Sequence, residues 1–296
     1  MASNDGVSGV TTRIMGILGY PLAHSLSPVM HNAAFSATGI NACYAPFVVT
    51  PENIKIAVNS LVALGVCGVN VTIPHKERVV PLLDELDSDA ERIGAVNTIV
   101  IKDSRLIGYN TDAKGFGNAF AEEVGYSLEG RRVMLFGAGG AARAVLAELI
   151  TEGVRDLVVV VRELERGTAM VKDLLADKQD GRVKVAVQTF EALHADIQRP
   201  DVLINATSVG LLPQDPILIP SGFVTSKMVV YDLIYNPPTT PLLDEAKRVG
   251  AIAINGLGML VHQGALAFQL WTGERAPKNV MRESLLRALE GIKHHP

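Results

Sequence analysis

A glycine-rich turn between an apolar strand and an apolar helix is the feature of this 296-residue sequence that most restricts its fold. The run Val133–Phe136 leads into G-A-G-G-A-A-R at 137–143, and the apolar stretch Ala144–Ile150 follows. This is the pattern G-x-G-x-x-A, in which the glycines permit a tight turn and a close approach of the backbone to a pyrophosphate. The N-terminus of the helix supplies the anion site. The pattern predicts a dinucleotide-binding βα unit, and a merely structural turn is the weaker alternative.

The rest of the second half continues this alternation of strands and helices. Six β-rich runs, most of them separated by helical or mixed segments, predict a parallel, doubly wound sheet that is covered on both faces: Val133–Phe136, Leu157–Val161, Val183–Val187, Val202–Asn205, Met228–Leu233 and Ala251–Ile254. After Gly258 the pattern is helical, over Met259–Trp271 and Asn279–Lys293. No third domain remains to be built, so these helices are expected to pack on the first domain.

The first half also alternates short strands with helices and includes a predicted hairpin, Asn97–Ile101 with Arg105–Tyr109. A helix is expected from Thr50 to near Gly65, and S-D-A-E at 88–91 has the pattern of a capping box. We therefore predict an α/β protein of two domains, which suits a chain of this length. A Rossmann-like doubly wound parallel-sheet domain would span residues 112–255. An N-terminal α/β substrate domain would span 13–111 and be completed by the C-terminal helices within 256–296. Residues 1–12 are polar and glycine-rich, and we expect a flexible tail.

Charge and composition exclude several classes of function. A net charge of −4 offers no electrostatic reason to bind nucleic acid or an anionic membrane. No apolar run approaches the roughly 20 residues of a membrane span. The histidines lack metal-ligand spacing, and Cys43 and Cys67 lie in apolar strand-like runs, where reduced core residues are expected. These observations predict a metal-free, cytoplasmic protein, and the sequence is compatible with either a monomer or a homodimer.

A pair of serines stands before a helix near the N-terminus, in G-Y-P-L-A-H-S-L-S-P-V-M-H-N at 19–32. Ser27 suits the N-cap of that helix and Pro28 its first turn. The hydroxyls of Ser25 and Ser27, beside the positive end of a helix dipole, could also hold a small anion such as a carboxylate. Capping uses only one serine, so both interpretations stay open at this point.

The residues after the second strand of the dinucleotide unit bear on which cofactor binds. Sites for NAD usually carry an acidic residue there, and sites for NADP carry basic residues for the 2′-phosphate. Here Val161 is followed by R-E-L-E-R at 162–166. Arg162 and Arg166 favour NADP, because guanidinium pairs well with phosphate. The intervening glutamates weaken this prediction, and a solvated, charged helix start is the alternative.

Three further polar clusters follow predicted strands or turns in the first domain. They are N-V-T-I-P-H-K at 70–76, G-A-V-N-T at 94–98 and G-Y-N-T-D at 108–112. Each polar residue alone has a structural explanation, since Asn and Asp often stabilise turns and Thr is common in strands. Together with Ser25 and Ser27, they form a set that a two-domain protein would seldom carry by chance.

With these motifs in this order, the sequence resembles the shikimate dehydrogenase family from Ile14 to Leu289. The match extends to N-A-T-S-V-G at 205–210 and to G-L-G-M-L-V-H-Q at 256–263. The resemblance implies the reversible reduction of 3-dehydroshikimate to shikimate with NADPH, in the pathway to aromatic amino acids. It also implies the two-domain architecture given above.

The resemblance transfers roles to residues by position in the motifs. Lys76 and Asp112 match the catalytic pair, which also contacts the substrate. Ser25, Ser27 and Tyr235 match the residues that hold the substrate carboxylate, and Thr72, Asn97 and Gln263 match those that bind ring hydroxyls. The residues matched to the cofactor site are Gly137, Ala138, Gly139, Gly140 and Ala141 at the pyrophosphate, and Thr207, Leu233 and Gly256 along the ribose and nicotinamide.

The main departure from the family pattern lies at the adenosine phosphate. Many NADP-using members carry N-R-T-x-x-R where this chain has Val161 followed by R-E-L-E-R. Arg162 and Arg166 are retained, but Glu163 adds a negative charge near the expected phosphate. NAD is therefore the alternative cofactor.

Two alternative functions remain open from the sequence. The nearer one is a quinate or dual quinate/shikimate dehydrogenase that uses NAD, although serine at position 27, where some quinate-using relatives carry threonine, favours shikimate. The more remote one is a non-catalytic dinucleotide-binding sensor. Such a protein would have no need of Lys76, Asp112 and the serine pair together.

Overall fold

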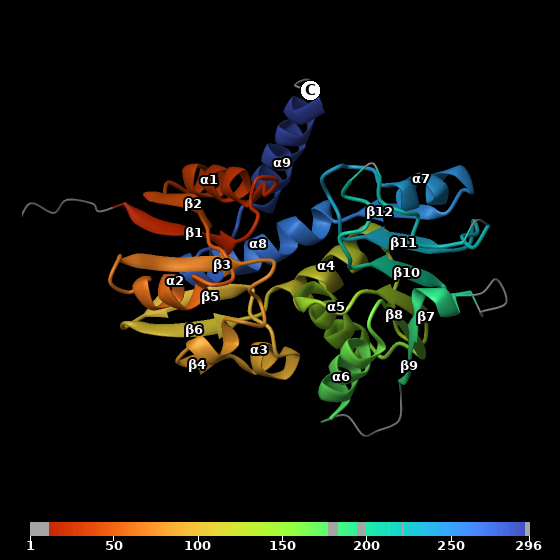
Figure 1. Cartoon of the computed structure of the whole chain (residues 1–296). Helices are drawn as coiled ribbons and strands as arrows, with labels where there is room; N and C mark the ends of the chain where they lie inside the picture. The colour runs from red at the N-terminus through yellow and green to blue at the C-terminus, as the bar shows by residue number, and fades with distance from the viewer. Residues whose placement is uncertain (1–11, 177–182, 194–198, 213, 221, 294–296) are drawn as a thin grey trace, which may run out of the picture.

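The computed structural model describes residues 12–176, 183–193, 199–212, 214–220 and 222–293. The expected tail at 1–12 therefore lies, except for Thr12, outside the described residues. The described chain forms two six-stranded sheets with helices around them, one sheet from each half of the sequence (Figure 1). This arrangement confirms the predicted α/β fold.

The second sheet is wholly parallel, as its apolar strands predicted, and has the order β12-β11-β10-β7-β8-β9. Its strands are β7 (Arg132–Phe136), β8 (Asp156–Val161), β9 (Lys184–Thr189), β10 (Val202–Asn205), β11 (Val229–Asp232) and β12 (Ile252–Asn255). The strand order reverses between β7 and β10, which makes a topological switch point. In open sheets of this kind, ligands bind at the carboxyl ends of the strands beside that point.

Both faces of this sheet are buried, which explains its nearly continuous valine, leucine and isoleucine content. Leu135, Val159 and Ile204 lie in one apolar cluster with α5 (Gly140–Thr151). Their neighbours along the strands lie in a second cluster on the opposite face, which also contains residues of α7 (Pro241–Arg248). Helix α6 (Leu164–Leu175) packs beside β8 and β9.

The first sheet is mixed and has the order β2-β1-β3-β5-β6-β4. Its strands are β1 (Arg13–Gly19), β2 (Ala42–Val48), β3 (Val66–Val71), β4 (Glu85–Leu86), β5 (Thr98–Lys102) and β6 (Arg105–Tyr109). Strands β1, β2 and β3 are parallel, whereas β5 and β6 form the predicted antiparallel hairpin. Its two-residue turn places Asp103 and Ser104 at positive φ, as hairpin turns of this length require.

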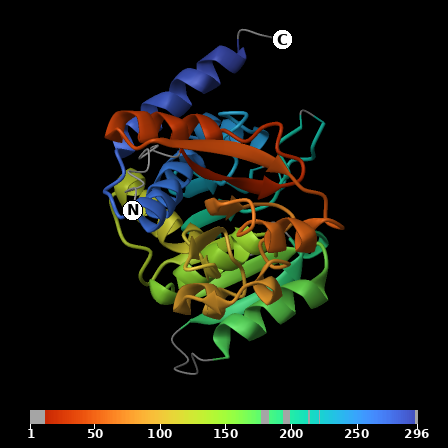
Figure 2. The same cartoon turned by 90° about the vertical axis from the view of Figure 1, so that its left-hand side faces the viewer.

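The two C-terminal helices pack together with the helices of the first half. The helices are α1 (Ser27–Thr38), α2 (Ile54–Ser60), α3 (Ser88–Ile93), α4 (Asp112–Val124), α8 (Leu257–Thr272) and α9 (Lys278–Lys293). Short 3₁₀ turns lie at Val80–Leu82 in the first half and at Phe190–Ala192 in the second half. Residues of α8 and α9 share one core with β1 and α1, so the C-terminal helices complete the first domain as predicted (Figure 2). Helix α4 packs against both α8 and α5 and so connects the two halves.

Two helix starts differ from the expected ones. Leu26, not Ser27, occupies the N-cap of α1, and Ser27 is already the first helical residue. The N-cap of α3 is Asp87, whose carboxylate accepts from the backbone amides of Asp89 and Ala90, so Ser88 does not begin a capping box. An ionised carboxylate is a stronger acceptor than a serine hydroxyl and takes the cap position here. The helix expected from Thr50 to near Gly65 is shorter and is flanked by turns.

The prediction for the cysteines was partly wrong. Cys43 and Cys67 are both free thiols, but Cys43 is exposed and Cys67 is half-buried. Strand β2 is at the edge of its sheet, so alternate residues face solvent while Tyr44 faces the core. An apolar run alone does not distinguish such an edge strand from a central one.

Candidate active site

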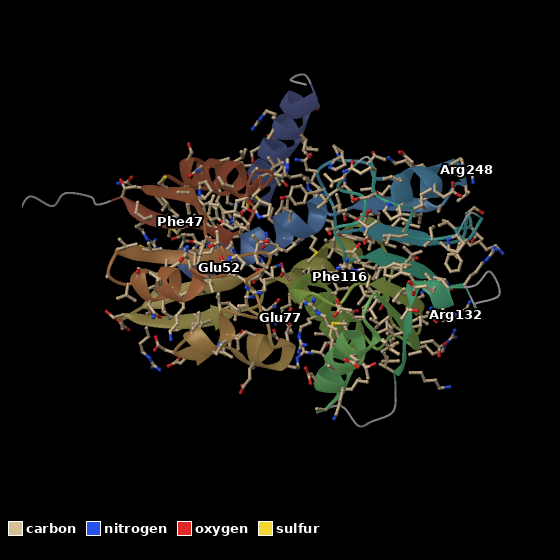
Figure 3. The ribbon with its side chains drawn as sticks, viewed as in Figure 1. Phe47, Glu52, Glu77, Phe116, Arg132 and Arg248 are labelled. Carbon is tan, nitrogen blue, oxygen red and sulfur yellow. The ribbon has the colours of Figure 1, made fainter. Side chains whose placement is uncertain are left out.

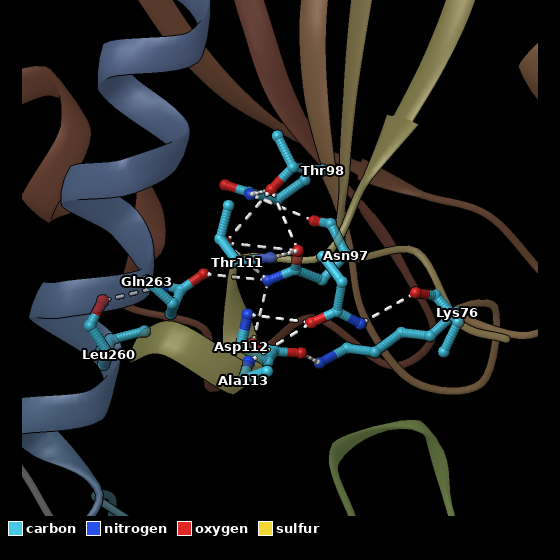
Figure 4. Close-up of polar contacts among 11 residues, drawn as sticks. Lys76, Asn97, Thr98, Thr111, Asp112, Ala113, Leu260 and Gln263 are labelled. Atoms are coloured by element: carbon cyan, nitrogen blue, oxygen red, sulfur yellow. Dashed lines mark hydrogen bonds and ion pairs between the residues drawn. The ribbon is translucent and has the colours of Figure 1, made fainter. Parts of the chain in front are cut away.

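A lysine and an aspartate from separate segments form an ion pair between the two halves of the protein. Lys76 lies in the loop after β3, and Asp112 is the first residue of α4. The Lys76 Nζ–Asp112 Oδ2 distance is 2.5 Å, and the two side chains are 14% and 6% exposed (Figure 4). The backbone of the loop is held as well, because the Lys76 carbonyl accepts from the Val96 amide at 2.8 Å. The predicted pair is therefore brought together in a partly buried position.

Asn97 holds the other oxygen of that carboxylate. Its side-chain amide donates to Asp112 Oδ1 at 2.9 Å and to Thr111 Oγ1 at 2.9 Å. The Gln263 carbonyl oxygen lies 3.4 Å from the same Asn97 nitrogen (Figure 4). The N-terminus of α4 adds a favourable dipole for the negative charge of Asp112. Both carboxylate oxygens thus have partners, and the geometry keeps Asp112 as an acceptor for Lys76.

The predicted carboxylate-binding hydroxyls also meet. The Tyr235 hydroxyl lies beside the Ser25 side chain and the Leu26 backbone. Tyr235 follows β11 of the second sheet, so this contact joins the two halves. Burial raises the pKa of Tyr235, which keeps its hydroxyl protonated and able to donate to an anion. Ser27 lies beside the hydroxyl of Tyr44.

Thr72 lies between the serine segment and the lysine loop. Its amide donates to the Leu18 carbonyl at 2.9 Å, and its carbonyl accepts from the His75 amide at 2.9 Å. Its methyl group occupies the space where a Cβ on Gly19 would lie. Thr72 is half-buried and stands at the end of β3, near the first residue of the serine motif.

The glycine loop has the shape that a pyrophosphate requires. Gly137 has a φ of 114°, and a Cβ there would approach the Ala206 carbonyl oxygen at 3.0 Å. Gly139 is the extended N-cap of α5, and no atom lies within 4 Å of the position its Cβ would take. The loop therefore presents bare backbone and a helix N-terminus to open space, at the switch point of the parallel sheet. The residues present fit a dinucleotide.

The other predicted cofactor residues lie at the carboxyl ends of the neighbouring strands. Thr207 donates from its hydroxyl and its amide to Asn205 Oδ1, at 2.7 and 3.0 Å, just after β10. Leu233 follows β11 and Gly256 follows β12, and a Cβ on Gly256 would overlap the Leu233 carbonyl. The structure thus brings the loop, Thr207, Leu233 and Gly256 to one edge of the sheet.

The two arginines predicted to bind phosphate lie after β8, and both are exposed. Arg166 Nη2 lies 3.5 Å from Glu77 Oε1, across the boundary between the halves. Figure 3 shows Glu77 in this central region. Glu163, the departure from the family pattern, is the N-cap residue of α6 and is exposed. Arg166 therefore has an acidic partner close to the expected phosphate position.

Sequence reasoning missed a second layer of buried polar side chains. The Tyr44 hydroxyl donates to Asn70 Oδ1 at 2.7 Å, and the Asn70 amide donates to the Asn97 carbonyl and to Thr98 Oγ1, at 3.1 and 3.0 Å. A similar hub centres on Asp232, which accepts from Asn205 at 3.0 Å and from Thr240 at 2.6 Å. Asn70 lies inside a motif that the sequence made conspicuous. Tyr44 stands in an apolar run that carries no such signal.

A buried histidine packs against Tyr44 of this layer. His31 is fully buried and stacks on Tyr44, with ring centroids 4.5 Å apart and an interplanar angle of 14°. Burial, opposed in part by Asn70, lowers the pKa of His31 to about 3. His31 is therefore neutral at physiological pH and adds no positive charge beside Tyr44.

Two observations concern metal binding and membrane-spanning helices. Within the described residues, no group of three or more His, Cys, Asp or Glu side chains could hold a metal ion. In the same part of the chain, no helix is both long and apolar enough to cross a membrane.

The chain matches three family models along its length. Residues 17–99 match the shikimate dehydrogenase substrate binding domain, 119–218 match shikimate / quinate 5-dehydrogenase, and 256–286 match the shikimate 5′-dehydrogenase C-terminal domain. These matches correspond to the first sheet, the second sheet and the C-terminal helices.

Individual relatives agree with these family matches. The chain is 45% identical over 280 residues to the shikimate dehydrogenase (NADP(+)) of Methanopyrus kandleri, covering 94% of this chain and 96% of that protein. A shikimate dehydrogenase crystallised with NADP+ superposes with a TM-score of 0.85 at 42% identity, over 94% of this chain and 96% of that one. The Listeria monocytogenes shikimate 5-dehydrogenase, crystallised with shikimate and NAD, gives a TM-score of 0.83 at 33% identity, over 94% and 98%. This chain belongs to the shikimate dehydrogenase family.

Proposed function

We propose that this protein is an NADP-dependent shikimate dehydrogenase that interconverts 3-dehydroshikimate and shikimate, with Lys76 and Asp112 as its catalytic pair. The observation that carries the proposal is the 2.5 Å contact between Lys76 and Asp112, beside the glycine loop of the second sheet. This contact supports Lys76 as a proton donor at the place where the two halves of the protein meet. The family membership and the names of the relatives support the substrate and the cofactor.

The two halves of the protein have different proposed roles. We assign substrate binding to residues 13–111 with 256–296, and cofactor binding to 112–255. The pyrophosphate would be held by the backbone of 137–141 and the N-terminus of α5, and the adenosine phosphate by Arg162 and Arg166. When bound, NADPH supplies the hydride; the protein supplies alignment and charge.

Proton transfer is the step that this chain's own residues perform. Reduction of a ketone builds negative charge on its oxygen, and the Lys76 ammonium donates a proton to that oxygen. In the reverse direction, the Lys76 amine accepts the proton from the hydroxyl. Asp112 Oδ2 holds Nζ in place, while the Asn97 amide nitrogen donates to Asp112 Oδ1. A positioned acid and base of this kind typically contributes about 10²- to 10⁴-fold to the rate.

Substrate recognition follows from the hydroxyl-rich groups at either side of Lys76. Ser25, Ser27 and Tyr235 are proposed to donate to the ring carboxylate. Thr72, Asn97 and Gln263 are proposed to bind the ring hydroxyls. Asn97 and Gln263 offer both donor and acceptor atoms, which suits hydroxyl groups that themselves both donate and accept. The contact between Tyr235 and Ser25 supports this arrangement, because it joins the two predicted segments.

A second candidate function is an NAD-dependent enzyme that acts on quinate. The ion pair between Arg166 and Glu77, together with Glu163 nearby, favours NAD by competing with a 2′-phosphate for the arginine. A quinate-using enzyme with NAD would share these polar residues, apart from Ser27, where some quinate-using relatives carry threonine. The free thiols of Cys43 and Cys67 support a reducing compartment, and we propose the cytoplasm.

Steady-state assays with both acids and both cofactors test these alternatives. We expect kcat/KM with shikimate and NADP+ to exceed kcat/KM for each of the other three combinations by at least about tenfold, a difference near 1.4 kcal/mol. A higher value with quinate and NAD+ would support the second candidate. Binding of dinucleotide without turnover of either acid would contradict both and would favour a sensor.

A further inference from the structure

Gly140 lies directly against the catalytic lysine. Gly140 is the first residue of α5 in the second half of the protein, and Lys76 belongs to the loop after β3 in the first half. A Cβ on Gly140 would lie 2.8 Å from Lys76 Cβ, 3.1 Å from Cδ and 3.4 Å from Cγ. The apolar stem of Lys76 therefore runs across the start of α5, in the space that any other residue at position 140 would need.

Backbone conformation does not explain this glycine. Gly140 is helical and is absent from the glycines with positive φ among the described residues, whereas Gly137 has a φ of 114°. In a helix, alanine is favoured over glycine by up to about 1 kcal/mol. The neighbouring Gly139 has no atom within 4 Å of its Cβ position. Within this loop, the steric demand of Lys76 falls on Gly140 and not on Gly139.

The lysine stem has little freedom to move aside. At one end, the Lys76 carbonyl is held by the Val96 amide at 2.8 Å, and at the other, Nζ is held by Asp112 at 2.5 Å. The next residue, Glu77, is paired with Arg166 of α6 at 3.5 Å. A group inserted at position 140 would therefore push the stem away from α5 and draw Nζ away from Asp112, or keep the two halves apart.

We propose that Gly140 is a positioning residue for Lys76: its missing side chain lets the dinucleotide loop support the lysine stem and so sets the position of Nζ. This role is additional to the close approach of the loop to pyrophosphate. It rests on the proposed function, because it concerns Lys76 as the proton donor. The glycine loop then serves both the cofactor and the acid–base group.

The test compares Gly140→Ala with the matched variant Gly139→Ala. For Gly140→Ala we expect kcat at saturating substrate and NADPH to fall about 10- to 100-fold, since displacement of a reacting group by about 1 Å has effects of this size. NADPH dissociation constants, from fluorescence titration without substrate, should stay within about threefold of wild type, a difference of about 0.65 kcal/mol. Gly139→Ala should show the reverse, with weaker NADPH binding and a smaller loss of kcat.

A crystal structure of Gly140→Ala provides a readout that does not depend on activity. We expect a Lys76 Nζ–Asp112 Oδ2 separation beyond hydrogen-bond distance, or the two halves further apart than in the wild-type protein. An unmoved Lys76, a kcat within about twofold of wild type, or a loss confined to NADPH affinity would overturn the proposal. Wild-type turnover and the activity of Lys76→Ala test the proposed function separately: if Lys76→Ala kept normal kcat, the proposed function would fail whatever Gly140→Ala did.

Discussion

Single residues of the site have fixed hydrogen-bonding roles. Asn70 donates its amide hydrogens to the Asn97 carbonyl and to Thr98 Oγ1, at 3.1 and 3.0 Å. A carbonyl can only accept, so the amide nitrogen of Asn70 must face Asn97 and its oxygen must face Tyr44. The Tyr44 hydroxyl proton is thereby committed to Asn70, and the Ser27 side chain neighbours the Tyr44 oxygen. Tyr44 thus lies between the serine segment and the network around Asn97.

Replacing Tyr44 with phenylalanine tests this link. The ring and its stacking on His31 would remain, but Asn70 Oδ1 would lose its donor in a buried position. We expect the free energy of unfolding, measured with urea, to fall by about 1–3 kcal/mol. Tyr20→Phe is the control, since Tyr20 is 46% exposed, and it should change stability by less than about 0.5 kcal/mol. Equal effects of the two substitutions would argue against a buried network.

Lys76→Ala tests the proton donor. We expect kcat to fall by about 10²- to 10⁴-fold, because the alkoxide would lose its positioned acid. The KM for shikimate should change far less, since the serines and Tyr235 would remain. Lys114→Ala serves as the control: Lys114 is 64% exposed and pairs with Asp89 at 3.2 Å, so kcat should stay within about twofold. A Lys76→Ala enzyme with near-normal kcat would exclude the assigned role.

At the scale of elements, the site is built from the ends of strands and helices. Asp112 begins α4, Gly140 begins α5, and Gly256 immediately precedes α8. Thr207 and Leu233 follow parallel strands β10 and β11. Helix starts supply amide groups without internal partners, and parallel strands end at a common edge. The fold therefore gathers these residues from distant parts of the chain.

The junction between β12 and α8 depends on the absence of a side chain at Gly256. A Cβ there would overlap the backbone of Leu233, which a side-chain rotation does not relieve. We expect Gly256→Ala to lower the free energy of unfolding by about 1–3 kcal/mol, the usual effect of overpacking. Gly291→Ala in α9 is the matched control, because its Cβ position is open. This control should be neutral or stabilising by up to about 1 kcal/mol. Comparable losses in both variants would contradict the close approach.

At the scale of the whole molecule, the two halves meet along a band of charged residues. Arg143 of α5 donates to the Ile93 carbonyl at 2.7 Å, and Arg166 pairs with Glu77. Glu148, also on α5, is partly buried against Gly117 of α4. Burial is the main reason that the pKa of Glu148 is raised to about 7, and the negative charges of Glu152 and Asp89 raise it further. The positive charges of Arg92 and Lys114 oppose this shift. This carboxyl group is therefore unfavourably placed when it ionises.

The resulting pH dependence has a definite sign. The pKa of Glu148 is about 7 in the folded protein, whereas an unfolded chain leaves it near the ordinary glutamate value of 4.5. Between these values the folded state binds more protons, so the Glu148 contribution to stability falls as pH rises from about 4.5 to about 7. We expect Glu148→Gln to be more stable than wild type at pH 8 by about 1 kcal/mol, allowing for solvent screening, and to show little difference at about pH 4.5. Exposed Glu129→Gln is the control, and a pH-independent effect of Glu148→Gln would contradict this explanation.

Local sequence patterns determine much of this architecture. The period of apolar residues and the glycine turn predicted the parallel sheet, its strand–helix alternation and the C-terminal helices. Polar residues at strand ends are conspicuous against apolar strands, and the family resemblance then assigned proposed roles to Lys76, Asp112, Asn97 and the serines. Local patterns were less reliable at element ends, where Leu26 and Asp87 take cap positions that Ser27 and Ser88 were expected to hold.

The tertiary structure alone decided which distant residues share a contact. Tyr44 in an apolar strand became part of the polar network only because β2 and β3 both flank β1 in one sheet, which brings it to Asn70. Gly140 and Lys76 are 64 positions apart (140 minus 76), and their contact depends on how the two halves pack. The sequence by itself determined the elements and the chemical groups, because propensity and patterning act over a few residues. The pairing of those groups required the packed fold, because steric exclusion and burial act between elements that no local pattern relates.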